Sequence, residues 1–275
     1  MNRYNGASQP DILLINDLPG NEAWQNSSGL TVRPVVIDPT KKTLILISAG
    51  QSQDANVQSN LYTPTNTANI DQLNPYDGLL YSTAGRLIGS SYSGYNGINL
   101  RLADFLISNG IFDRVILAGL NIGASSVWDW ANGALASRIP AAVKRFAALG
   151  ILPSTPGVTF ALKWAQGEQD AAVLGTSQAA YVASFNAMMA NARAAGFSGR
   201  TFVRLETYYI GGATSATIRA AQVQVVNGTT IFQGADTDAF DGSYRSDGLH
   251  FLTDVAAGAV ASADFWAMHA SGAPF

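Results

Sequence analysis

The stretch TLILISAG, residues 43–50, decides the fold. Its apolar run is the length of a strand and ends in small residues, which is typical of a strand buried on both faces of a parallel sheet. Comparable apolar runs follow at residues 115–118, 158–162 and 201–205.

Between and after these runs, apolar residues recur at the spacing of a helix. This spacing covers residues 98–106, 135–147, 181–192, 220–226 and 255–266. Gly110 and Gly196 follow two of these segments as stops, and Pro140 disturbs the early turns of another. Alternating strands and helices predict an α/β fold in which helices cover both faces of a central parallel sheet.

The remaining stretches lack a clear period. Residues 1–40 carry scattered Pro, Gly and Asn, and we expect them to be an extended lead-in packed on the domain. Residues 41–275 then form one domain, since no repeat, low-complexity tract or linker divides them. Residues 56–96 are rich in Asn, Thr, Ser, Tyr and Gly, and we expect long loops there.

Composition excludes several classes of function. Of the 275 residues 47% are hydrophobic and 13% are charged, the opposite of the balance found in disordered chains. A net charge of −3 gives no electrostatic footprint for nucleic acid, and no basic run indicates an anionic membrane surface. The chain has no cysteine and only two histidines, so we expect no disulfide, metal site or cofactor.

The sequence has no apolar stretch long enough for a signal peptide or a transmembrane helix. We therefore expect a protein of the cytoplasm or of a larger particle, unless a signal has been trimmed. The sequence does not indicate the oligomeric state.

Polar residues follow the predicted strands and precede the last helix. Ser52 comes after the first strand, Gly123 after the second and Gln166 after the third, whereas His250 lies just before the final helix. Ligands of such folds bind beyond the carboxyl ends of the strands, so these residues should converge on one rim.

These residue types suit ester cleavage. A serine hydroxyl becomes a good nucleophile when an imidazole takes its proton, and a carboxylate on the other ring nitrogen fixes the tautomer. Ser52, His250 and Asp247 can fill these roles, because a tight turn can bring Asp247 to His250. A developing oxyanion needs preorganised donors, which backbone N–H groups near a glycine or an amide side chain can supply.

Each of these residues also has a structural interpretation. Gly and Ser are common in turns, and Asp247 can cap the helix that follows it. Glu168 can be a solvated charge, Trp128 is more often a core residue than a sugar platform, and His269 is expected at the surface.

Four blocks resemble the SGNH hydrolases. GQS at residues 50–52 is similar to the first block of sialate O-acetylesterase-like and plant-type carbohydrate acetylesterases, and GASSVWDW at 123–130 resembles the second. WAQGEQDA at 164–171 resembles their W-x-Q-G-E-x-D-A block, the most specific of the four, and DGLH at 247–250 resembles D-x-x-H. Ala124 replaces the second glycine of the usual G-G pair.

The resemblance implies a three-layer α/β/α fold of flavodoxin type. It implies Ser52 as nucleophile, His250 as base and Asp247 as the orienting acid. The implied oxyanion hole comprises the N–H groups of Ser52 and Gly123 with the amide of Gln166 or, under the general family pattern, of Gln169; we favour Gln166.

The function indicated is removal of O-acetyl groups from a carbohydrate, so the expected partner is an acetylated saccharide or another small ester. Residues expected to contact it are Gln51, Tyr92, Trp128, Glu168 and Tyr244. A lipase or thioesterase on the same fold remains open, as does a carbohydrate-binding protein that has lost catalysis. The sugar and the ester position cannot be read from the sequence.

Overall fold

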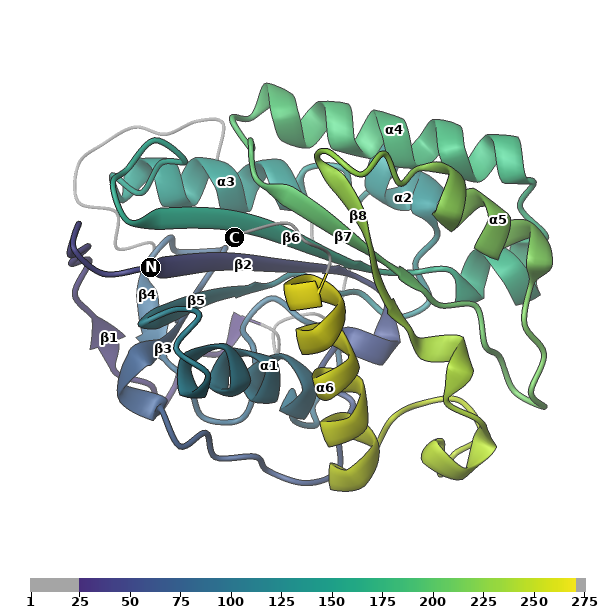
Figure 1. Ribbon diagram of the computed structural model, residues 1–275, viewed down its shortest axis with the longest axis horizontal. Helices are drawn as coiled ribbons and strands as arrows, with labels where there is room; N and C mark the ends of the chain where they lie inside the picture. The colour runs from purple at the N-terminus through teal and green to yellow at the C-terminus, as the bar shows by residue number, and fades with distance from the viewer. Residues whose placement is uncertain (1–24, 271–275) are drawn as a thin grey trace.

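The computed structural model describes residues 25–270, and a single mixed sheet of eight strands runs through them in the order β1-β4-β3-β5-β2-β6-β7-β8 (Figure 1). The strands are β1 Val32–Arg33, β2 Thr43–Gly50, β3 Ile70–Leu73, β4 Leu80–Ser82, β5 Arg114–Gly119, β6 Val158–Ala165, β7 Arg200–Leu205 and β8 Ile231–Asp236. The helices are α1 Gly97–Ser108, α2 Val127–Ala131, α3 Arg138–Ala148, α4 Gln178–Ala194, α5 Ala216–Gln224 and α6 Asp254–Ala270.

Helices lie on both faces of the sheet, as Figure 1 shows. The helices α1 and α6 cover one face, and α2, α3, α4 and α5 cover the other. Alternate residues of β2 serve the two cores: Ile45 and Ile47 pack toward α3 and α4, whereas Leu44 and Leu46 pack toward α1 and α6. The predicted three-layer α/β/α fold is therefore confirmed.

The sheet is not parallel throughout. From β3 to β8 neighbouring strands run parallel, but β4 pairs antiparallel with both β3 and β1 at one edge. The strand β1 comes from the segment expected to be an extended lead-in. Residues 1–24 of that segment lie outside the described residues.

Two strands, β3 and β4, lie within residues 56–96, where we expect long loops, and the strand β8 is not predicted from the sequence. The sequence of β3, IDQL, lacks the apolar run of a buried strand because two of its four residues are polar. Both polar side chains are nevertheless buried and hydrogen-bonded inside the protein. The Asp71 carboxylate accepts a hydrogen bond from Arg114 Nε at 2.8 Å, and the side-chain oxygen Oε1 of Gln72 accepts from the Ile88 N–H at 2.8 Å.

In the final helix, α6, the large apolar side chains of Val255 and Trp266 face solvent. Val255 and Trp266, which lie on one side of α6, are 77% and 59% exposed, whereas Ala256 and Val260 on the other side are buried.

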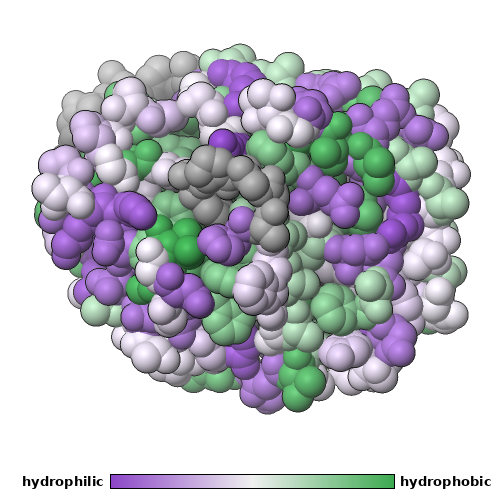
Figure 2. All heavy atoms as spheres, viewed as in Figure 1, coloured by the Kyte–Doolittle hydropathy of each residue, from purple (hydrophilic) through white to green (hydrophobic). Residues whose placement is uncertain are grey.

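Apolar and polar residues are interspersed over the face of the molecule in Figure 2. Within residues 25–270 no helix combines the length and apolar character needed to cross a bilayer.

The order of the strands changes direction at β2. The strand β2 pairs in parallel with β5 on one side and with β6 on the other. The connection after β2 leads to β3 and β5, whereas the connection after β5 crosses to β6 on the other side. Ligands of open α/β sheets bind at the carboxyl ends of the strands where the order reverses in this way. Gln51 and Ser52 follow β2 directly at that point.

Candidate active site

A tight junction between β2 and β6 sets the turn that carries Ser52. Gly50 has φ +135°, and a Cβ added there would lie 1.9 Å from the carbonyl oxygen of Ala165 on β6. The same oxygen accepts a hydrogen bond from the Gln51 N–H at 2.8 Å. Only glycine fits this position, because it has neither a Cβ nor a penalty for positive φ. Ser52 then begins a short 3₁₀ turn, Ser52–Asp54.

Hydrogen bonds from asparagine side chains hold this turn in place. The carbonyl oxygen of Asp54 accepts hydrogen bonds from the side chains of Asn96, Asn99 and Asn121, at 2.9, 3.3 and 3.1 Å. These residues come from the start of α1 and the end of β5 and are fully buried. The backbone just after Ser52 is thus held by two separate elements.

His250 meets Ser52 and Asp247 through its two ring nitrogens. Its Nε2 lies 2.9 Å from Ser52 Oγ, and its Nδ1 lies 2.7 Å from Asp247 Oδ2. With the proton on Nδ1, the ring donates to Asp247 and accepts from Ser52. The Asp247 Oδ1 atom accepts from the backbone N–H groups of Leu249 and His250, at 2.9 and 2.6 Å, which form the tight turn expected from the sequence.

Asp247 is suited to remain a carboxylate. Partial burial acts to raise its pKa, but hydrogen bonds from the His250 backbone and ring and from the Leu249 N–H outweigh it, so the pKa lies below its ordinary value. A carboxylate in this position favours the His250 tautomer that leaves Nε2 free to accept a proton.

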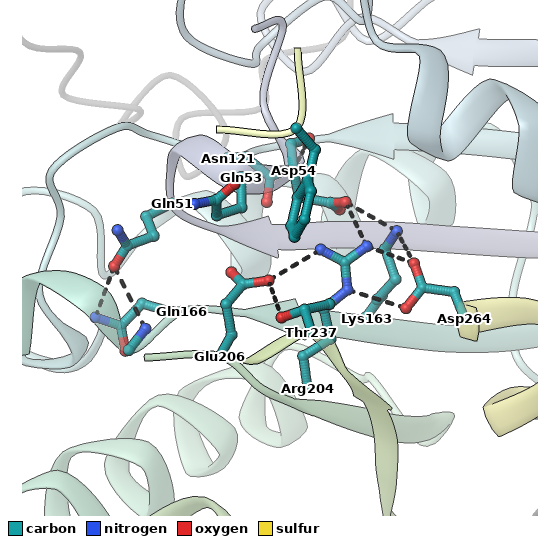
Figure 3. A network of polar contacts seen from close by, with 12 residues as sticks. Gln51, Gln53, Asp54, Asn121, Lys163, Gln166, Arg204, Glu206, Thr237 and Asp264 are labelled. Atoms are coloured by element: carbon teal, nitrogen blue, oxygen red, sulfur yellow. Dashed lines mark hydrogen bonds and ion pairs between the residues drawn. The ribbon is translucent and has the colours of Figure 1, made fainter. Parts of the chain in front are cut away.

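A buried ion cluster lies behind the nucleophile turn (Figure 3). Asp54 faces Lys163 Nζ at 3.0 Å and Arg204 Nη2 at 2.9 Å, and Asp264 of α6 contacts the same two cations. Burial would raise the pKa of Asp54, but Arg204 and Lys163 hold it far below its ordinary value. Glu206 extends the cluster, 3.2 Å from Arg204. This cluster is not predicted from the sequence, because Lys163 and Arg204 stand inside apolar strand patterns.

The Gly123 loop forms the opposite side of the site. The Gly123 N–H donates to Ser91 Oγ at 2.9 Å, so this expected oxyanion donor already has an acceptor. Ala124, which stands where the resemblance expects a second glycine, has φ +55°. It occupies the left-handed region that glycine enters freely, so the loop keeps its conformation with a strained alanine.

Gln166 does not point its amide toward an open site. The side chain is fully buried, and its Nε2 donates to the Ser125 carbonyl at 3.1 Å and to Asp170, with Gln51 Oε1 at 3.4 Å. An amide has two N–H hydrogens, and these acceptors use both. Gln166 therefore braces the loops in this structure instead of facing an oxyanion, which differs from our expectation. The expected alternative, Gln169, contributes its backbone N–H to Gln51 Oε1 at 3.3 Å.

Of the residues expected to contact the substrate, Tyr92 and Gln51 lie beside His250 and Ser52, whereas in residues 25–270 Trp128 and Tyr244 are not in contact with them. Tyr92 lies edge-on to His250, with ring centroids 6.3 Å apart, and Gln51 directly precedes Ser52. Trp128 is 56% exposed on α2, against the structural interpretation that made it a core residue. The Tyr244 ring packs on the Phe240 ring, with centroids 5.1 Å apart. Within the described residues, no hydrogen bond or ring contact joins Tyr244 to Ser52 or His250.

Glu168 is buried, not a solvated charge and not accessible to a sugar. It is 1% exposed, and within the described chain neither carboxyl oxygen meets a donor of another residue. Burial, with the neighbouring charge of Glu206, raises its pKa well above the ordinary value. Burial raises the pKa of Glu206 as well, but Arg204 and Thr237 bind its carboxylate, which favours protonation of Glu168 over Glu206.

Comparisons with known proteins bear on the fold. No protein-family model matches the sequence, and no curated protein sequence matches it. Among solved structures, a protein from Arabidopsis thaliana has a TM-score of 0.60 at 19% identity, over 82% of this chain and 98% of its own. NanS has a TM-score of 0.57 at 16% identity, over 86% of this chain and 98% of its own.

A carbohydrate acetylesterase from Xanthomonas citri also aligns, with a TM-score of 0.51 at 15% identity, over 82% of this chain and 55% of its own. The chain has the SGNH hydrolase fold. At these identities the likeness concerns the fold alone. It agrees with the resemblance seen in the four sequence blocks.

Proposed function

We propose that the chain is a serine esterase that removes O-acetyl groups from a carbohydrate through an acyl-enzyme intermediate. The observation that carries the proposal is the relay Ser52–His250–Asp247, with contacts of 2.9 and 2.7 Å, at the carboxyl end of β2. These three groups come from two segments of the chain: His250 lies 198 positions after Ser52 and three positions after Asp247. A chance turn serine would have no imidazole and carboxylate aligned behind it.

In the proposed reaction Ser52 Oγ attacks the ester carbonyl carbon while its proton passes to His250 Nε2. Asp247 stabilises the imidazolium through Nδ1. His250 then gives this proton to the departing sugar oxygen, which leaves acetyl on Ser52. A water molecule repeats the sequence with His250 as base, and acetate is released.

The oxyanion requires donors beside Ser52. The Ser52 N–H lies on the turn fixed by Gly50, and the Gly123 N–H becomes a donor to substrate when the oxyanion replaces Ser91 Oγ as its acceptor. Gln51 is also well placed, because its Oε1 accepts from the neighbouring β6 loop and its NH₂ group points the other way (Figure 3).

Hydrolysis of 4-nitrophenyl acetate tests the proposal. Ser52→Ala should remain folded and lose on the order of 10⁴–10⁶ in kcat, because members of such a relay act as a unit. His250→Ala should behave alike. The controls are Ser59→Ala and His269→Ala, since both side chains are exposed and His269 stacks on Phe265 of α6.

A fluorophosphonate probe should label Ser52, and labelling should vanish in Ser52→Ala. Near-wild-type turnover in Ser52→Ala would falsify the mechanism. Acetate release from acetylated xylan, acetylated sialic acids and bacterial polysaccharides then identifies the substrate. A chain that hydrolyses none of these esters while retaining saccharide binding would instead be the carbohydrate-binding alternative.

A further inference from the structure

Tyr92 is held in an unusual backbone conformation. Its φ is +70°, in the left-handed region that bulky residues rarely adopt. Strain of this kind persists where surrounding contacts impose it, and it is concentrated at functional sites.

The preceding residue supplies those contacts. The Ser91 N–H donates to the Asn121 carbonyl at 2.8 Å, and the Ser91 carbonyl accepts from the Asn56 N–H at 3.1 Å. Ser91 Oγ accepts from Gly123. The segment is therefore tied to the stretch after the nucleophile turn and to the loop after β5, and these ties fix the direction of the Tyr92 side chain.

The Tyr92 ring lies over the reacting groups. Its ring meets the His250 ring edge-on, with centroids 6.3 Å apart and an interplanar angle of 63°, and its hydroxyl lies near the Ser52 side chain. A Cβ added at Gly123 would lie 2.1 Å from the Tyr92 hydroxyl oxygen. The hydroxyl thus lies beside Gly123, whose N–H we propose as an oxyanion donor, and borders the position where the oxyanion of an ester would develop.

We propose that Tyr92 is a further catalytic residue, whose hydroxyl donates a hydrogen bond to Ser52 Oγ in the free enzyme and to the oxyanion in the transition state. The inference rests on the proposed esterase function and deepens it. Ser52 uses its own hydrogen toward His250, so its lone pairs are free to accept from Tyr92.

Attack on the ester changes which oxygen is the better acceptor. As Oγ bonds to the carbonyl carbon it loses electron density, while the former carbonyl oxygen, attached to the same carbon, gains a negative charge. The Tyr92 hydrogen bond shifts to the charged oxygen and strengthens, as electrostatic stabilisation requires. No proton leaves Tyr92 in this step. Burial raises the pKa of Tyr92, so the hydroxyl remains a donor at neutral pH.

The test compares Tyr92→Phe with Tyr95→Phe. Both remove one hydroxyl from the same loop and keep the ring, but the Tyr95 ring lies near Arg86, away from these groups. In Tyr92→Phe we expect kcat for 4-nitrophenyl acetate to fall about 10²-fold with KM nearly unchanged, the usual loss for one oxyanion donor. Tyr95→Phe should retain wild-type kinetics.

Inhibition by phenylboronic acid provides a second readout, because its adduct with Ser52 is a tetrahedral anion. Its inhibition constant should rise in Tyr92→Phe by about the factor lost in kcat/KM. A Tyr92→Phe variant with wild-type kcat and boronate affinity overturns the inference. So does a change in KM alone, which would make Tyr92 a substrate-binding residue.

A lid would behave differently. If Tyr92 merely covered the site, Tyr92→Ala would be faster than wild type and Tyr92→Phe would be unaffected; either result refutes the donor role. Fluorophosphonate labelling distinguishes a failure of the proposed esterase function from a failure of the proposed role of Tyr92. Absence of labelling at Ser52 in the wild type refutes the esterase function and the Tyr92 inference with it, whereas wild-type labelling rates in Tyr92→Phe refute the Tyr92 inference alone.

Discussion

Glu168 differs from the other carboxylates near the site because it is buried and, among residues 25–270, no other residue donates a hydrogen bond to it. Asp54, equally buried, faces two cations, and Asp247 receives three hydrogen bonds. A buried carboxyl group without such partners is more stable when it is protonated. This explains why the pKa of Glu168 is raised while those of Asp54 and Asp247 are lowered.

This pKa makes stability depend on pH. The folded-state pKa of Glu168 lies above its unfolded value, so its contribution is most favourable in acid and is lost as pH rises through the folded pKa. Glutamine cannot ionise. We therefore expect the Tm of Glu168→Gln relative to wild type to increase between about pH 5 and pH 8, as measured by thermal melting.

Asp241→Asn is the control for this measurement. Hydrogen bonds from Ser243 lower the pKa of the exposed Asp241, so this group is ionised in both states above about pH 5. Its Tm difference from wild type should be constant over the same interval. A Glu168→Gln difference that is equally constant, or that falls with pH, would show that Glu168 is ionised in the folded protein.

At the scale of elements, the site depends on how closely the carboxyl end of β2 approaches β6. Gly50→Ala should displace this junction, because the new Cβ would meet the Ala165 carbonyl and φ is +135°. Gly110→Ala has φ +68° but open space around the new Cβ, so it isolates the backbone strain, which is about 1–3 kcal/mol.

We expect Gly50→Ala to lower the free energy of unfolding by more than Gly110→Ala and to reduce esterase activity in the fraction that folds. Denaturant unfolding and kcat measure the two effects. Equal losses of stability would mean that β6 moves aside at little cost, and unchanged activity would mean that Ser52 does not depend on this contact.

At the scale of the whole molecule, the sequence predicted the elements whose apolar residues report directly on burial. The strands β2, β5, β6 and β7 were predicted because their runs are apolar. Ser52, His250 and Asp247 were proposed as a relay because they follow or precede such elements, and the structure brings their side chains into contact. Long-range polar pairing left no local pattern. Asp71 is buried in β3 because Arg114 reaches it from β5, and Glu168 is buried beside Glu206, which comes from a different strand end.

The orientation of Gln166, which we expected to be an oxyanion donor, could not be predicted for the same reason. A motif indicates which residue types are present, but Gln166 is turned toward Asp170 and Ser125 by contacts that only the fold creates. The φ of Tyr92 likewise follows from the hydrogen bonds of Ser91 to two distant segments.

The surroundings of Ser52 predict which esters the molecule accepts. Gln51, which directly precedes Ser52, and Tyr92, which lies edge-on to His250, place an amide and a phenol group close to the relay. Such groups suit a hydroxyl-rich alcohol and a short acyl group. A lipase gains about 0.8 kcal/mol for each methylene that it buries in an apolar groove. These polar groups offer no such gain, so a longer acyl chain meets steric resistance without compensation.

In a series of 4-nitrophenyl esters, acetate should therefore be hydrolysed fastest, butyrate more slowly and octanoate very slowly. The measurement is kcat/KM for each ester at one pH, with Ser52→Ala subtracted as the background. Restricting the comparison to Ser52-dependent turnover separates acyl preference from spontaneous hydrolysis. A kcat/KM that increases from acetate to octanoate would contradict the carbohydrate acetylesterase proposal and favour a lipase or thioesterase, while leaving the roles of Ser52, His250 and Asp247 intact.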